Sequence, residues 1–215
     1  KNILCLDIED FFGSINFGRV RGLFMAHPYN LPSNVSTVLA QICCYQNKLP
    51  QGSPTSPTVS NMICAKMDDE LKHFASINKC IYTRYADDIT FSTRQFKFPS
   101  SMVNYDNPTT ACGIQLHDII KNNGFKINIK KFRIKKKNDR QEITGVIVNR
   151  FLNVKREFIK EIRSMIHAWQ KYGLENAQKV YLEKFNKHIN TSFKNTYKFE
   201  NVLKGKIEFL GMVRG

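Results

Sequence analysis

The stretch 81–92, near the middle of the chain, constrains the fold most strongly. It holds two adjacent carboxylates, Asp87 and Asp88, between two runs rich in aromatic and β-branched side chains. A period-two alternation on both sides of this polar break is typical of a β-hairpin with the acids at its tip. Asp is also a common turn residue whose side chain caps its own backbone. The stretch alone therefore supports a structural turn and a catalytic tip about equally, and a second acid elsewhere would decide between them.

A candidate for that second acid ends the first apolar run of the chain. Residues 3–6 are continuously apolar, which is typical of a central strand buried on both faces, and Asp7 follows them. If the hairpin pairs beside this strand, Asp7, Asp87 and Asp88 converge at one edge of a sheet. Such a cluster repels itself unless cations neutralise it, and Mg²⁺ prefers oxygen ligands. Two such ions roughly 3.5–4 Å apart stabilise the attacking and leaving oxygens of a phosphoryl transfer.

The remaining pattern predicts a mixed α+β part over 1–150 and a basic helical part over 151–215. Apolar spacing in the first part predicts helices over 16–25, 35–43, 57–74 and 116–120. Alternation predicts further strands over 125–129, continuing through a basic run to 137, and over 143–148. Residues 96–113 are predicted to form a surface loop or a partly disordered insertion. From residue 154 the pattern is helical to the end, with a stop at Gly173.

Basic charge dominates and is unevenly distributed. The net charge is +15, and from Lys130 onward 21 basic side chains face only 8 acidic ones. This asymmetry indicates a polyanionic partner such as nucleic acid, against the simpler reading of a soluble basic surface. The six cysteines show no C-x-x-C spacing, which favours a reducing compartment. Cys112 and His117 lack a second ligand pair, so no zinc site is expected.

No apolar run is long enough to span a membrane, and no signal-peptide pattern opens the chain. The chain starts at Lys1 without Met, directly in a predicted strand. We therefore expect a fragment, or a chain whose first part is not shown.

Three segments resemble, in order and spacing, successive palm motifs of reverse transcriptases. They are Asp7–Phe12, Gln51–Pro57 and Tyr85–Asp88. Two later segments, Gly124–Asn128 and Ile143–Asn149, resemble the next motif and the primer-grip region with a Thr-Gly pair. The best match is the bacterial retron-type group, which includes retron and defence-associated enzymes. The resemblance implies a right-hand polymerase palm, with an antiparallel sheet and helices packed on one face, followed by a helical thumb. Under this resemblance, we expect the fingers to be largely missing from this sequence.

The resemblance implies an RNA-directed DNA polymerase that uses two Mg²⁺ ions. Asp7 and Asp87 resemble the principal metal ligands, with the Ile8 backbone carbonyl as a further ligand and Asp88 in support. Phe12 matches the aromatic residue under the nucleotide sugar, which would clash with a 2′-hydroxyl; its neighbour Phe11 is expected in the core.

Other residues carry implied roles in nucleotide and primer binding. The loop residues Gln51 and Gly52 resemble those that touch the incoming nucleotide and template, and Gly permits close backbone approach. Lys130 or Lys131 would act on the departing pyrophosphate, with a solvated basic strand as an equal alternative. The primer terminus would be bordered by Tyr85, Ala86, Thr144 and Gly145. Tyr85 would equally suit the hairpin core.

The implied partners are an RNA template, nascent DNA and deoxynucleoside triphosphates, with a cognate non-coding RNA and an effector protein as further candidates. The implied location is the bacterial cytoplasm, without a membrane. Two alternatives remain. One is an RNA-dependent RNA polymerase, which Phe12 and Ala86 disfavour, and the other is a catalytically inactive nucleic-acid-binding palm fragment.

Overall fold

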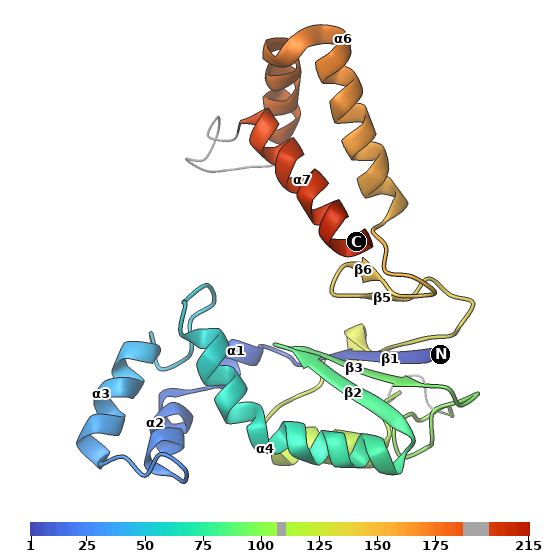
Figure 1. The fold of residues 1–215 in the computed structure, drawn as a ribbon. Helices are drawn as coiled ribbons and strands as arrows, with labels where there is room; N and C mark the ends of the chain where they lie inside the picture. The colour runs from blue at the N-terminus through green and yellow to red at the C-terminus, as the bar shows by residue number, and fades with distance from the viewer. Residues whose placement is uncertain (107–110, 187–197) are drawn as a thin grey trace. The chain divides into compact units, whose positions relative to one another are not determined.

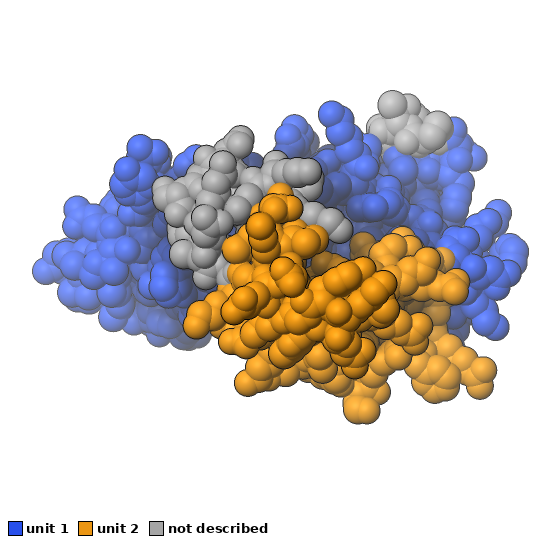
Figure 2. Space-filling view, turned by 90° about the horizontal axis from the view of Figure 1, so that it is seen from above, with its two compact units in different colours: residues 1–139 blue, residues 140–215 orange. Residues whose placement is uncertain are grey.

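The computed structural model describes residues 1–106, 111–186 and 198–215. The chain divides into two compact units, residues 1–139 and 140–215, which are coloured separately in Figure 2. This division falls before the palm–thumb boundary expected at residue 150, which stays a prediction about function. Among the described residues, no helix combines the length and the apolar character needed to cross a membrane. All six cysteines are free thiols, as their spacing predicted.

A four-stranded sheet organises the first unit (Figure 1). Its strands are β1 (Asn2–Asp7), β2 (Cys80–Tyr85), β3 (Asp88–Thr93) and β4 (Arg133–Lys135). The spatial order is β2-β3-β1-β4, and every neighbouring pair is antiparallel. The predicted hairpin is therefore confirmed as β2 and β3, and the apolar run forms an inner strand. Pairing of β1 with β3 was the condition for bringing the acids together, and it is met.

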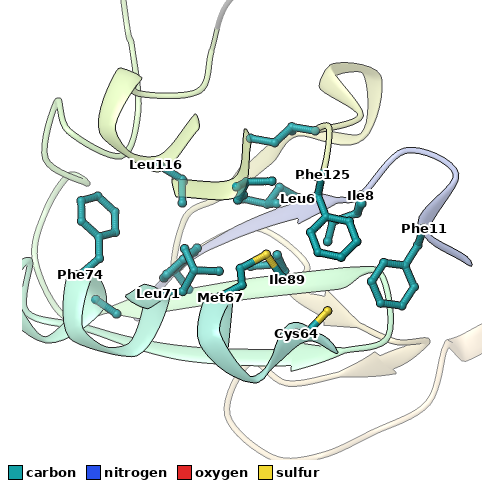
Figure 3. Packing of buried hydrophobic residues seen from close by; sticks show 14 of the residues in the cluster. Leu6, Ile8, Phe11, Cys64, Met67, Leu71, Phe74, Ile89, Leu116 and Phe125 are labelled. Atoms are coloured by element: carbon teal, nitrogen blue, oxygen red, sulfur yellow. The ribbon is translucent and has the colours of Figure 1, made fainter. Parts of the chain in front are cut away.

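Helices α4 (Ser56–Ile77) and α5 (Ile114–Asn122) lie against one face of this sheet (Figure 1). The predicted apolar side of α4 is confirmed, with Met67 and Leu71 fully buried against sheet residues such as Leu6 and Ile89 (Figure 3). Pro57 occupies the first turn of α4, where its missing N–H has no helical partner to lose. One continuous apolar core thus holds the helix layer to the strands that carry the acids.

Three shorter helices complete the first unit: α1 (Phe11–Ser14), α2 (Phe17–Met25) and α3 (Ser33–Cys43). Asn16 caps α2 by accepting a hydrogen bond from the Arg19 amide. In α3 the apolar spacing predicted a buried side of Val35, Val38, Leu39, Ile42 and Cys43, and this is only partly right, because Cys43 is buried and Leu39 half-buried. Val35, Val38 and Ile42 are exposed, and the small residues Ser36 and Ala40 are buried instead, because α3 packs closely against α2.

The predicted strand over 125–129 is also wrong. Ile127 makes only an isolated bridge to Ile8, and Ile129–Lys131 form a short 3-10 helix, η2, before β4 begins. The chain turns here because the Asn128 amide donates to the Asp7 carbonyl at 2.8 Å, beyond which β1 has ended. In the predicted loop, Phe98, Met102 and Val103 are buried, and residues 107–110 lie outside the described residues.

The second unit begins with a small hairpin, β5 (Glu142–Ile143) and β6 (Val146–Ile147), in place of the single strand predicted over 143–148. Its helices are α6 (Arg156–Asn186) and α7 (Phe199–Arg214), which share an apolar core that includes Ile162, Met165 and Leu203. Gly173 breaks α6 with a φ of 77°, as the predicted stop required.

Candidate active site

Two acids face each other where β1 ends and β3 begins. Asp7 is the cross-strand partner of Asp88, and Asp7 is only 5% exposed. Asp87 lies beside them in the two-residue turn that connects Tyr85 to Asp88. The Ile8 amide donates to the Asp87 carbonyl at 3.1 Å and ties this turn to the end of β1. The structure thus brings Asp7, Ile8, Asp87 and Asp88 to one edge of the sheet.

The environment of these acids disfavours further negative charge. Burial, followed by the charges of Asp87 and Asp7, raises the pKa of Asp88. Lys131 neutralises part of this negative charge, because its Nζ atom lies 2.7 Å from Oδ2 of Asp7. The hydrogen bond to Asp7 in turn raises the pKa of Lys131. A repelling set of carboxylates that already attracts one cation has the chemistry of a divalent-metal site.

The carboxylates do not form a preorganised coordination site made of protein side chains alone. No group of three or more His, Cys, Asp or Glu side chains positioned to hold a metal occurs among the residues that the structure describes. This is expected where Mg²⁺ keeps water and substrate phosphates among its ligands and takes only one or two carboxylates from the protein. The donor types fit Mg²⁺.

The structure distinguishes the two neighbouring lysines. Both lysines belong to η2 and are exposed, but Lys131 forms an ion pair with Asp7, whereas Lys130 forms no ion pair within the described part of the chain. Asn128, to which the sequence reasoning assigned no role, also contacts Asp7. Its amide donates to the Asp7 carbonyl, and its Nδ2 lies 3.5 Å from Oδ1 of Asp7. Its position just before the two lysines, in the segment that resembles a motif, was the available signal.

The two phenylalanines after β1 have different surroundings. Phe11 is buried, as expected, and stacks on Phe125 with ring centroids 5.6 Å apart. Phe12 contacts the Phe11 ring edge-on at 5.1 Å and is only partly buried. Phe12 therefore keeps part of its surface accessible at the end of β1, close in sequence to Asp7.

The loop before α4 exposes both of its predicted binding residues, Gln51 and Gly52. Gly52 has a φ of 86°, and an added Cβ would meet nothing within 4 Å. Backbone conformation, rather than crowding within this chain, is what favours glycine there. The Ser56 hydroxyl donates to the Pro50 carbonyl at 2.7 Å and fastens the loop to the start of α4.

The predicted primer-terminus residues lie in both units. Tyr85 is 74% exposed beside the turn, so the alternative that it belongs to the hairpin core is wrong. Ala86 precedes Asp87 with a φ of 52°. Thr144 and Gly145 form the turn of the β5–β6 hairpin in the second unit, with φ values of 46° and 86°. Two positive φ angles are the signature of a type I′ hairpin turn, which explains why one predicted strand became two.

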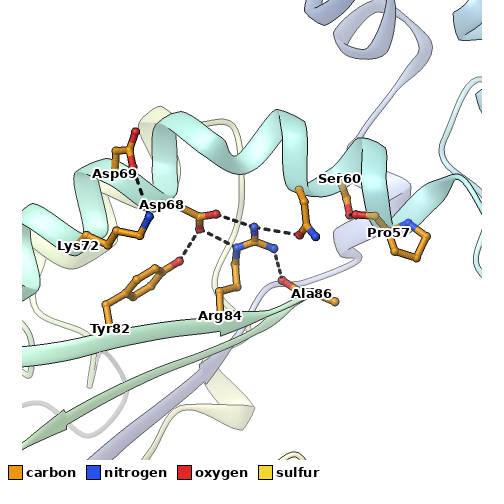
Figure 4. A network of polar contacts seen from close by, with 9 residues as sticks. Pro57, Ser60, Asp68, Asp69, Lys72, Tyr82, Arg84 and Ala86 are labelled. Atoms are coloured by element: carbon orange, nitrogen blue, oxygen red, sulfur yellow. Dashed lines mark hydrogen bonds and ion pairs between the residues drawn. The ribbon is translucent and has the colours of Figure 1, made fainter.

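A buried ionic network behind the turn was missed from the sequence (Figure 4). Arg84 on β2 donates through Nε and Nη2 to the two carboxylate oxygens of Asp68 on α4, at 2.8 and 2.7 Å. The Tyr82 hydroxyl donates to the same carboxylate at 2.7 Å. Burial raises the pKa of Asp68, but the hydrogen bonds from Arg84 and Tyr82 outweigh burial and hold it below its usual value.

Comparison with known proteins identifies a family and several similar proteins. A family described as "Reverse transcriptase (RNA-dependent DNA polymerase)" matches residues 1–148. The retron Ec86 reverse transcriptase of Escherichia coli is 39% identical over 166 residues, covering 77% of this chain and 48% of that protein. The retron Mx162 reverse transcriptase of Myxococcus xanthus is 30% identical over 193 residues, covering 79% of this chain and 39% of that protein.

Among solved structures, a telomerase from Candida albicans, in complex with a fragment of telomeric RNA, aligns with a TM-score of 0.48 and 12% identity. That alignment covers 99% of this chain and 44% of the telomerase chain. The chain spans less than half the length of each of these three proteins.

Proposed function

The chain belongs to the retron-type reverse transcriptase family, and we propose that the protein carrying it is an RNA-directed DNA polymerase. It extends a 3′-hydroxyl with deoxynucleoside triphosphates on an RNA template. The supporting observation is the pairing of Asp7 with Asp88 across β1 and β3, with Asp87 in the adjoining turn. The two segments that carry these acids are far apart in sequence, and both resemble catalytic motifs of the family.

In this proposal the carboxylates hold magnesium. Asp7 and Asp87 would be the principal ligands, the Ile8 carbonyl a further one, and Asp88 a support. Two bound ions supply Lewis-acid stabilisation of the attacking and leaving oxygens. The attraction of Lys131 to Asp7 supports the assignment, because it places a cation against one of these acids. The pKa of Asp88 is raised first by burial and then by the charges of Asp87 and Asp7, so a bound cation would be needed to offset that negative charge.

The chain's own residues would orient the substrates around these acids. Phe12 would lie under the sugar and exclude a 2′-hydroxyl, and the exposed loop with Gln51 and Gly52 would meet the incoming nucleotide. Lys131, rather than Lys130, would donate a proton or positive charge to the departing pyrophosphate, because Lys131 is the lysine in contact with Asp7. The hydrogen bond to Asp7 raises the pKa of Lys131 and so keeps its positive charge in place.

The exposed residues around the turn would contact the primer. Tyr85 and Ala86 border the acids. Thr144 and Gly145 are proposed as primer-terminus residues only through their resemblance to the primer-grip region. The positive charge from Lys130 onward would bind backbone phosphates without sequence preference. A cognate non-coding RNA, an effector protein and a role in antiviral defence extend the proposal by analogy with the family.

The direct test is primer extension by the intact protein. A DNA primer on an RNA template is supplied with Mg²⁺ and either deoxynucleotides or ribonucleotides. We expect extension with deoxynucleotides by the wild type and none by Asp87→Asn. Asp69→Asn is the matched control, because it removes an exposed carboxylate from α4, away from the sheet edge. Retained extension by Asp87→Asn would refute the metal assignment, and a preference for ribonucleotides would favour an RNA polymerase.

A further inference from the structure

An arginine on the inner face of an edge strand is unusual enough to require an explanation. The side chain of Arg84 is only 5% exposed, so it is not available to bind a substrate from solution. Its charge is neutralised by a bidentate ion pair with Asp68, which fixes the plane of the guanidinium group against α4. Asn61, one further residue on α4, accepts a third hydrogen bond from Nη2 at 3.2 Å.

The remaining bond of this guanidinium goes to the turn that carries the acids. Nη1 donates to the carbonyl of Ala86 at 3.0 Å (Figure 4). Ala86 has a φ of 52°, a left-handed conformation that costs free energy for any residue with a Cβ. The next residue is Asp87, whose carbonyl accepts the Ile8 amide. The strained turn is therefore held from α4 through Arg84 and from the end of β1 through Ile8.

We propose that Arg84 is a positioning residue that clamps the Ala86 carbonyl to α4 and thereby sets where Asp87 stands relative to Asp7. Asp68 fixes the orientation of the Arg84 guanidinium, and Arg84 in turn fixes the Ala86 carbonyl. The turn held in this way positions the carboxylate of Asp87. The inference rests on the proposed function, since it assigns Arg84 to the same site. If Arg84 only linked β2 to α4, its contact with Asp68 would be sufficient. Its additional hydrogen bond to the Ala86 carbonyl reaches the turn itself.

Arginine suits this position for a geometric reason. Its planar fork donates in several fixed directions at once, so a single side chain joins the Asp68 carboxylate to the Ala86 carbonyl. A lysine ammonium is a point charge that does not hold the two acceptors in one plane. The exchange of Arg84 for Lys should therefore weaken the clamp even though the charge is kept.

The test compares Arg84→Gln with Tyr82→Phe in the intact protein. Tyr82→Phe removes one hydrogen bond to Asp68, whereas Arg84→Gln removes both of the Arg84 hydrogen bonds to Asp68, their ion pair and the bond to Ala86. The first readout is hydrogen exchange of the Ile8 amide in the metal-free protein, because that amide is bonded to the Asp87 carbonyl. We expect exchange about ten-fold faster in Arg84→Gln and unchanged in Tyr82→Phe, under conditions where both are folded.

The second readout is the kinetics of primer extension. We expect kcat to fall roughly ten- to hundred-fold in Arg84→Gln, since small displacements of a reacting group have effects of this size. KM for the template–primer should stay within about two-fold of the wild type, because Arg84 is buried away from it. Tyr82→Phe should leave both constants near their wild-type values.

Equal Ile8 exchange and equal kcat in Arg84→Gln and Tyr82→Phe would overturn the inference and leave Arg84 a structural ion pair. If Arg84→Gln does not fold, Arg84→Lys replaces it. Faster Ile8 exchange and lower kcat in Arg84→Lys support the clamp, and wild-type values for both refute it. Absence of extension by the wild type would refute the proposed function, whereas the Ile8 exchange would still report whether Arg84 holds the turn.

Discussion

The Nζ atom of Lys131 lies 2.7 Å from Oδ2 of Asp7, so the second lysine of η2 is paired with the acid that ends β1. Lys131 and Asp7 are separated by 124 positions in the sequence. Their contact exists because β1 and the segment that leads into β4 meet at the same end of the sheet. This one contact distinguishes two adjacent lysines that the sequence pattern treats alike.

The first prediction concerns this pair of lysines. Lys131→Met should slow nucleotide addition by about a hundred-fold, the usual scale for loss of a general acid. Lys130→Met is the matched control and should stay close to the wild type, because the ion pair with Asp7 is made by Lys131 and not by Lys130. Single-turnover extension rates measure both. Equal losses in the two variants would show that the basic strand acts only through its overall charge.

The second prediction tests sugar selection. Phe12→Ala should increase ribonucleotide incorporation, because the partly buried ring is proposed to exclude the 2′-hydroxyl. The control is Phe11→Leu, which alters the neighbouring core ring and should reduce stability without changing selectivity. Competition between the two nucleotide types on one primer–template is the measurement. Unchanged selectivity in Phe12→Ala would count against the assignment.

The third prediction concerns pH and stability through Asp68. Its pKa is lower in the folded protein, so its stabilising contribution is complete above the unfolded pKa and is lost as pH falls through the folded value. Asp68→Asn should cost about 3 kcal/mol at pH 7, because it leaves Arg84 buried without a counter-charge. The difference should begin to shrink as pH falls below about 4, the pKa of an unperturbed Asp, and should be lost only once pH falls through the lower pKa of the folded protein.

Urea unfolding of the wild type and Asp68→Asn across this pH range provides the measurement. Asp69→Asn serves as control, because its exposed ion pair with Lys72 should contribute less than about 1 kcal/mol at any pH. A difference between wild type and Asp68→Asn that stays constant with pH would contradict the prediction.

The fourth prediction separates two glycines by backbone conformation. Gly52→Ala should destabilise the protein by about 1–2 kcal/mol, because the φ of 86° disfavours any Cβ even where space is open. Gly22→Ala, within α2, should stabilise by about 0.5–1 kcal/mol, because alanine suits a helix interior and nothing lies within 4 Å of its Cβ. The sign of the two changes in unfolding free energy is the check.

The local pattern predicted the β2–β3 hairpin but not which of its faces is buried. Alternation separates Tyr82 and Arg84 from Ile81 and Tyr85, and hydrophobicity alone would place the latter pair inside. The structure has Ile81 61% exposed and Arg84 almost fully buried. The inner face of β2 carries the polar groups of Tyr82 and Arg84 because α4 supplies Asp68 as their partner. A strand pattern contains no information about the helix that will cover it.

The period-two alternation of apolar and polar residues also extends over a segment that does not form a strand in the structure. The period-two pattern after Gly124 favours a long strand, but the backbone at Asn128 bonds to Asp7 and turns into η2 before β4 starts. The free energy that a local strand preference contributes is smaller than that of the tertiary hydrogen bonds that compete with it.

The sequence by itself determined which chemical groups the protein has: the acids at a strand end and at a hairpin tip, the aromatic pair after the first strand, and the basic excess. It also determined the family, through the order and spacing of motifs. Only the tertiary structure decided that Asp7 faces Asp88, that Lys131 rather than Lys130 joins them, and that Arg84 supports the turn. These contacts depend on sheet register and on the packing of α4, which join positions far apart in the chain and are therefore absent from any local pattern.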